Sequence, residues 1–194
     1  MTLASKITVG RIFMIPVFAA LAWSYGQSTR DGAADESLRW WALAVFIIAA
    51  SSDGVDGWVA RRFNQKSDFG AFIDPIADKG LMLTGVLVAC LLDWGTVGWR
   101  LPFWFVALVF LREAVILGGI AALWLRHRHV TMDPHWSSKL CTVLQMFALG
   151  WVMLRMPLFP PALACVPAAL LTVWSGIEYF GRGLRILRGV ERVH

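Results

Sequence analysis

Apolar and polar positions follow one another along the chain in long blocks. Six apolar stretches are separated by short polar connections. About 20 apolar residues are needed for a helix to cross a membrane, and only helices or closed barrels satisfy their backbone hydrogen bonds in lipid. The pattern therefore predicts six transmembrane helices, over residues 7–25, 39–59, 71–92, 101–124, 138–154 and 160–180.

The connections between these stretches are short. Residues 26–38 are polar and acidic, residues 93–100 contain glycine, residues 125–137 are rich in Arg and His, and residues 157–161 form a tight turn between prolines. The first stretch follows a basic residue, as in a signal peptide, but no convincing cleavage site follows Tyr25. We interpret it as a retained span.

Composition agrees with this interpretation. The 194 residues are 58% hydrophobic and 16% charged, whereas soluble domains carry about 25% charged residues. We expect an all-α, polytopic integral membrane protein that forms a single membrane-embedded domain over residues 1–194. Three cysteines lie inside apolar stretches with no pairing pattern, so we expect small core residues rather than a redox or metal site; they are Cys90, Cys141 and Cys165.

The distribution of Lys and Arg predicts the orientation. With the N-terminus in the cytosol, eleven basic residues lie inside and four lie outside, which satisfies the positive-inside rule. The inner set is Lys6, Arg61, Arg62, Lys66, Arg126, Arg128, Lys139, Arg182, Arg185, Arg188 and Arg192, and the outer set is Arg30, Arg39, Arg100 and Arg155. The net charge of +5 then favours anionic headgroups over nucleic acid. His127, His129 and His135 are interpreted as solvated loop residues.

Two pairs of carboxylates lie near the inner ends of the second and third spans. Asp53 and Asp56 share one helix face, and Asp74 and Asp78 share another. Charges at apolar depth cost about 2.5–3.5 kcal/mol each on insertion scales, so four without compensation approach about 10 kcal/mol. Carboxylates are the ligands that Mg²⁺ uses together with substrate phosphates. The pairs therefore predict a cation site that opens toward the cytosol.

The residues around these acids follow a defined spacing, D-x2-D-G-x2-A-R-x8-G-x3-D-x3-D. It is formed by Asp53, Asp56, Gly57, Ala60, Arg61, Gly70, Asp74 and Asp78. This pattern resembles the signature of the CDP-alcohol phosphotransferases, and every fixed position is present.

The resemblance implies a role for each residue of the signature. Asp53, Asp56 and Asp74 hold a pair of Mg²⁺ or Mn²⁺ ions, with Asp78 near the second ion and also the candidate base. A CDP pocket is formed by Asp53, Gly57, Ala60, Arg61 and Gly70. The base takes a proton from an acceptor hydroxyl, which attacks the lipid-linked phosphorus and expels CMP.

Later residues bear on the acceptor. Arg112 and Glu113 interrupt the fourth span, and Lys139, Thr142 and Gln145 are polar positions along the fifth. With Arg11 and the run DPIADK, they resemble the phosphatidylglycerophosphate synthase branch, where a K-x-x-T-x-x-Q stretch recurs. That branch usually has Gly before the Lys and often a second Lys before the Thr, whereas this chain has Ser138 and Cys141. Arg112 and Lys139 are our candidate acceptor-binding residues, although Arg112 could instead pair with Glu113 or Glu178 for structure.

The expected enzyme transfers a phosphatidyl group from CDP-diacylglycerol to sn-glycerol 3-phosphate. The resemblance also implies a homodimer, which we expect in the cell's inner (cytoplasmic) membrane. The distribution of Lys and Arg predicts that the active site and both termini face the cytosol. The same chemistry with phosphatidylglycerol (cardiolipin synthesis) or an inositol phosphate as acceptor is an alternative. A small cation transporter is a more distant one, and it would favour a repeated pair of broken spans, which this sequence lacks.

Overall fold

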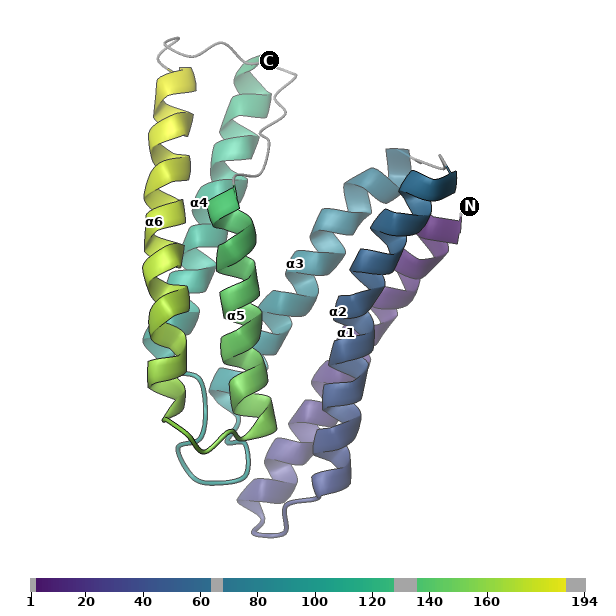
Figure 1. The fold of residues 1–194 in the computed structure, drawn as a ribbon, viewed down its shortest axis with the longest axis vertical. Coiled ribbons are helices and arrows are strands. Elements are labelled where there is room, and N and C mark those ends of the chain that lie inside the picture. The colour runs from purple at the N-terminus through teal and green to yellow at the C-terminus, as the bar shows by residue number, and fades with distance from the viewer. Residues whose placement is uncertain (1–2, 64–67, 128–135, 188–194) are drawn as a thin grey trace. The chain divides into compact units, whose positions relative to one another are not determined.

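The computed structural model describes the backbone of residues 3–63, 68–127 and 136–187, and the side chains of residues 10–52, 79–119, 137–181 and 185. Within these ranges all regular structure is helical (Figure 1). The helices are α1 (Leu3–Arg30), α2 (Glu36–Phe63), α3 (Asp68–Leu91), α4 (Phe103–His127), α5 (Trp136–Leu154) and α6 (Pro161–Leu187). The predicted all-α class is confirmed, and each predicted segment corresponds to one helix.

Several helices extend beyond the apolar stretches that predicted them. The loop expected over residues 26–38 is reduced to residues 31–35, because α1 continues to Arg30 and α2 begins at Glu36. Asp35 caps α2: its carboxylate accepts the Ser37 N–H over 3.0 Å, and its carbonyl accepts the Leu38 N–H over 3.1 Å. The Ser37 hydrogen bonds hold the pKa of the Asp35 carboxyl below its ordinary value. Polar capping therefore sets this helix start, not hydrophobicity.

The chain forms two compact units, Met1–Arg100 and Leu101–His194. In the first unit α1 packs against both α2 and α3. The Phe18 and Phe46 rings join α1 to α2 with centroids 5.4 Å apart. Gly26 on α1 lies so close to Leu92 that an added Cβ would come within 2.6 Å of that side chain. A glycine is therefore required for this close approach of α1 to the end of α3.

In the second unit α6 packs against both α4 and α5 (Figure 1). Small, fully buried residues allow α5 and α6 to approach closely; they are Cys141, Ala148, Cys165 and Ala168. At the far end of α5, the Trp151 and Phe159 rings stack 3.8 Å apart, and the Trp151 indole N–H donates to the Phe159 carbonyl over 3.1 Å. The three cysteines are buried and form no disulfide, so the expectation of core residues is confirmed.

The outward faces of the described helices are apolar. Phe13, Trp41, Leu111, Leu170 and Ile177, from four different helices, are each between 63% and 69% exposed. By length and composition, two of the described stretches can cross a membrane, Ser137–Leu154 and Pro161–Gly181; Lys79–Leu91 is a shorter apolar helix. An apolar surface of this kind is typical of a protein surrounded by lipid.

Candidate active site

The four predicted metal ligands lie on two adjoining helices of the first unit. Asp53 and Asp56 belong to the second half of α2, and Asp74 and Asp78 to the first half of α3. Asp56 is seven residues before the end of α2 at Phe63, and Asp74 is six residues after the start of α3 at Asp68. With about 1.5 Å of rise per residue, the two pairs lie at similar heights on helices that pack against each other.

The expected CDP-binding residues occupy the same ends of these helices. Gly57, Ala60 and Arg61 follow the first acid pair in α2, and Gly70 precedes the second pair in α3. The side chains of residues 53–78, which include all eight positions of the signature, lie outside the described side chains. Their roles therefore stay predictions, and the backbone contributes only their register.

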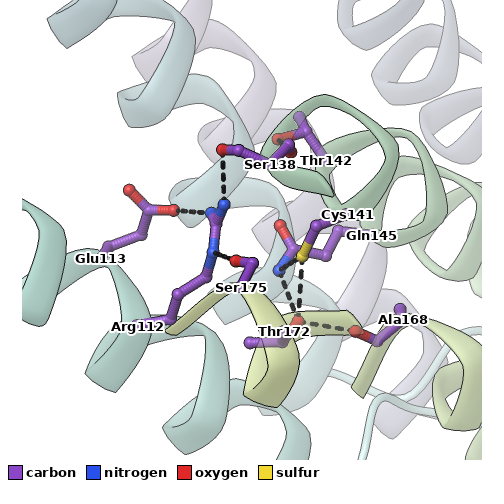
Figure 2. Close-up of polar contacts among 9 residues, drawn as sticks. All are labelled: Arg112, Glu113, Ser138, Cys141, Thr142, Gln145, Ala168, Thr172 and Ser175. Carbon is purple, nitrogen blue, oxygen red and sulfur yellow. Dashed lines mark hydrogen bonds and ion pairs between the residues drawn. The ribbon is translucent and has the colours of Figure 1, made fainter. Parts of the chain in front are cut away.

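Arg112, a predicted acceptor ligand, lies in the interior of the second unit and is only 4% exposed. Its Nε–H donates to Ser175 Oγ on α6 over 2.8 Å, and Nη2 donates to Ser138 Oγ on α5 over 2.7 Å. Nη1 forms an ion pair with the Glu113 carboxylate, which is 3% exposed. Figure 2 shows the guanidinium among these three partners. Arg112 therefore links α4 to both α5 and α6, and Glu113 balances its charge.

The first turn of α5 has a second link. Ser137, which is 1% exposed, donates its hydroxyl to the Glu178 carboxylate of α6 over 2.7 Å. Lys139, the other predicted acceptor ligand, follows these two serines and is exposed. Arg112 therefore binds Ser138, the residue that directly precedes Lys139 in the chain.

A third polar group lies one to two turns further along α5. Gln145 is fully buried, and its amide donates to Thr172 Oγ1 over 3.0 Å and to Cys141 Sγ over 3.4 Å (Figure 2). Thr172 in turn donates to the Ala168 carbonyl over 2.6 Å. Thr142 binds back to the Ser138 carbonyl over 3.1 Å. The K-x-x-T-x-x-Q residues thus divide into one exposed cation and two groups that bind the protein itself.

A comparison with known families identifies the chain. The model of the CDP-alcohol phosphatidyltransferase family matches residues 1–176. This chain belongs to that family. The match covers the first compact unit and the second as far as residue 176, so the acid pairs of α2 and α3 and the cluster around Arg112 are parts of one family sequence.

Curated relatives in this family match over nearly the whole chain. A protein of Mycobacterium tuberculosis (strain ATCC 25618 / H37Rv) named "Probable phosphatidylglycerophosphate synthase" is 35% identical, over 98% of this chain and 85% of its own length. The Bacillus subtilis (strain 168) protein named CDP-diacylglycerol–glycerol-3-phosphate 3-phosphatidyltransferase is 33% identical, over 96% and 97%. A Pseudomonas fluorescens protein with the same name is 33% identical, over 92% and 88%. The resemblance inferred from the signature is confirmed.

CDP-alcohol phosphatidyltransferases generally depend on a divalent metal ion. No group of three or more His, Cys, Asp or Glu residues suited to a metal occurs among the side chains that the structure describes, and the four aspartates lie outside that part. Their donor chemistry fits, because carboxylates are the hard oxygen ligands that Mg²⁺ and Mn²⁺ prefer and the four aspartates have similar registers on α2 and α3.

Sequence reasoning found Arg112, Glu113 and Lys139 but missed most of their partners. Of the two acids considered for Arg112, Glu113 is its ion-pair partner, while Glu178 accepts a hydrogen bond from Ser137. A signal for the missed residues exists on α6. Thr172, Ser175 and Glu178 are spaced three apart in an otherwise apolar stretch, which marks one polar helix face.

Proposed function

We propose that this chain is a phosphatidylglycerophosphate synthase. It transfers the phosphatidyl group of CDP-diacylglycerol to sn-glycerol 3-phosphate, releasing CMP and forming phosphatidylglycerophosphate. The observation that carries the proposal is the match, over nearly the full length of the chain, to relatives that bear this name. The names of these relatives do not mention the alternative acceptors, phosphatidylglycerol and an inositol phosphate.

The reaction is assigned to the residues of the signature. Asp78 is the base that takes the proton from the acceptor hydroxyl, and the freed oxygen forms a new bond to the phosphorus next to the diacylglycerol. The bond from that phosphorus to the oxygen of CMP breaks, and CMP leaves with the electron pair. Asp53, together with Gly57, Ala60, Arg61 and Gly70, holds the CDP group, because small residues let a nucleotide approach the helices closely.

Asp53, Asp56, Asp74 and Asp78 are proposed to hold two ions, Mg²⁺ or Mn²⁺. Such ions neutralise the negative charge that develops on the diphosphate as CMP leaves. The support is the register of the two acid pairs, since the four aspartates are at similar positions along the adjoining helices α2 and α3. Without a cation, four carboxylates at this depth would be strongly unfavourable.

Lys139 and Arg112 are proposed to bind the phosphate of the acceptor. Lys139 is exposed at the start of α5 and supplies a mobile positive charge. Arg112 uses three of its five N–H donors on Ser138, Ser175 and Glu113, so two remain for phosphate oxygens. Because Glu113 balances the Arg112 charge, Lys139 supplies most of the net attraction and Arg112 supplies directional hydrogen bonds.

We further propose that all six helices cross the membrane and that residues 1–194 form one embedded domain. Strongly exposed Phe, Trp, Leu and Ile side chains on four helices support spans beyond the two apolar stretches of α5 and α6. The distribution of the basic residues supports a cytosolic location for both termini and the active site, on the inner side of the cell's inner membrane. A homodimer is expected from the family.

The test uses purified protein in detergent or vesicles with CDP-diacylglycerol and Mg²⁺. We expect CMP release only when glycerol 3-phosphate is added, and loss of release when the metal is removed with EDTA. CMP release that needs no acceptor would make the protein a hydrolase. Cation flux through vesicles without any CMP release would support the transporter instead.

A further inference from the structure

The first turn of α5 is hydrogen-bonded to both α4 and α6. Ser137 donates to Glu178 of α6 over 2.7 Å, and Ser138 accepts from Arg112 of α4 over 2.7 Å. Two of these four side chains, Arg112 and Ser137, are at most 4% exposed, and Ser138 and Glu178 are partly buried. Both hydrogen bonds are partly buried and join a hydroxyl to a charged group, and such bonds are stronger than neutral ones in water. This turn is therefore held much more firmly than the end of an ordinary surface helix.

Lys139 is the next residue, and unlike the two serines its side chain is exposed. This flexible four-carbon side chain takes its starting point from the backbone that Ser137 and Ser138 fix. A displacement of a binding group by about 1 Å can cost about a hundredfold in rate. A lysine that binds a small phosphate therefore needs a fixed backbone position.

We propose that Ser137, Ser138 and Glu178 are positioning residues for the acceptor, which act through Lys139 by clamping the first turn of α5 between α4 and α6. This inference rests on the proposed binding of the acceptor phosphate by Lys139. Ser138 stands where the phosphatidylglycerophosphate synthase branch usually has Gly, so the link from Arg112 to α5 is a feature of this chain rather than of the signature.

The clamp is tested by removing its hydroxyls. Ser137→Ala and Ser138→Ala each delete one link while keeping α5 helical, because Ala is the best helix former. Each change should raise the KM for glycerol 3-phosphate by about threefold to tenfold, the equivalent of one net hydrogen bond. The KM for CDP-diacylglycerol should stay unchanged. Ser137→Thr keeps the hydroxyl and should restore the wild-type KM for the acceptor.

A double-mutant cycle identifies the partner. Ser137→Ala and Glu178→Ala remove the same hydrogen bond, so adding Ser137→Ala to Glu178→Ala should raise the acceptor KM no further. Glu178→Gln keeps an oxygen that accepts from Ser137 and should remain near wild type. If the effects of Ser137→Ala and Glu178→Ala simply add, the two residues do not act as a pair and the clamp is refuted.

The decisive comparison is made in a Lys139→Gln background. If the clamp acts through Lys139, Ser137→Ala should add no further increase in the acceptor KM there. As a matched control, Trp151→Phe removes a hydrogen bond at the opposite end of α5 and should leave both KM values unchanged.

Two results would overturn the clamp: wild-type acceptor KM values in Ser137→Ala and Ser138→Ala, or the same increase with and without Lys139. Failure of the proposed function looks different. In that case the wild-type enzyme itself forms no phosphatidylglycerophosphate from glycerol 3-phosphate, whatever the variants do.

Discussion

The Nε–H group of Arg112 on α4 donates to the Ser175 hydroxyl on α6 over 2.8 Å, and both side chains are buried. The adjacent Glu113 supplies the counter-charge within the same interior. A buried charge that loses its partner is strongly unfavourable, whereas an apolar replacement of the whole pair is often tolerated. Stability and acceptor binding therefore place different demands on these residues, and variants can separate them.

Glu113→Ala should destabilise the protein by about 3–5 kcal/mol, because it leaves the Arg112 charge without its ion-pair partner. The double change Arg112→Met and Glu113→Leu should recover much of that loss while abolishing efficient use of glycerol 3-phosphate. Thermal unfolding in detergent and acceptor KM values measure the two effects. A double variant as unstable as Glu113→Ala would show that packing, rather than the unmatched charge, is responsible.

Lys139→Gln should raise the KM for glycerol 3-phosphate by about tenfold to a hundredfold. Arg112→Gln should do the same and should also lower the thermal unfolding temperature, because it leaves the buried Glu113 carboxylate without the Arg112 charge. Hydrogen bonds to charged groups contribute about 1.5–3 kcal/mol, and each factor of ten corresponds to about 1.4 kcal/mol. The KM for CDP-diacylglycerol should change much less, because that substrate is assigned to the aspartates and the signature residues. Lys139→Arg keeps the charge and serves as the control. Equal losses for both substrates would remove these two residues from the acceptor site.

Asp53→Asn, Asp56→Asn and Asp74→Asn keep side-chain size but remove a charged metal ligand. Activity should collapse in each, and the Mg²⁺ concentration needed for residual activity should rise. Asp78→Asn should also abolish turnover while sparing much of the binding of CDP-diacylglycerol, measured by equilibrium binding of the labelled lipid. Near-normal turnover in Asp78→Asn would rule out its assignment as the base.

Hydrophobic periodicity was enough to predict the helices, because each long apolar stretch has to satisfy its own backbone. It could not predict their ends: α1 continues through polar residues to Arg30, and α2 starts at Glu36 because Asp35 caps it. The signature at Asp53–Asp78 could be recognised in the sequence because its residues lie close together in the chain. The partners of Arg112 were not, since Ser175 lies 63 residues away and only tertiary packing brings it near.

Topology can be tested with single added cysteines, since Cys90, Cys141 and Cys165 are buried. Ser28, near the end of α1, is unsuitable because its hydroxyl donates to the Tyr25 carbonyl and accepts from the Asp35 N–H. The first loop, residues 31–35, is expected to face outward. Ala33 is exposed in the same loop and is the better choice. Ala33→Cys should react with an impermeant thiol reagent in intact cells, and Ser67→Cys should not. The reverse pattern would put the aspartates on the wrong side for cytosolic substrates.

The central claim is the identity of the acceptor. Purified enzyme should be offered CDP-diacylglycerol and Mg²⁺ with glycerol 3-phosphate, an inositol phosphate or phosphatidylglycerol in separate reactions, and the lipid product identified by mass spectrometry. We predict phosphatidylglycerophosphate and an equal amount of CMP with glycerol 3-phosphate, and little product with the other two. Product formed only with phosphatidylglycerol would contradict the account, because that acceptor has no terminal phosphate for Lys139 and Arg112 to bind.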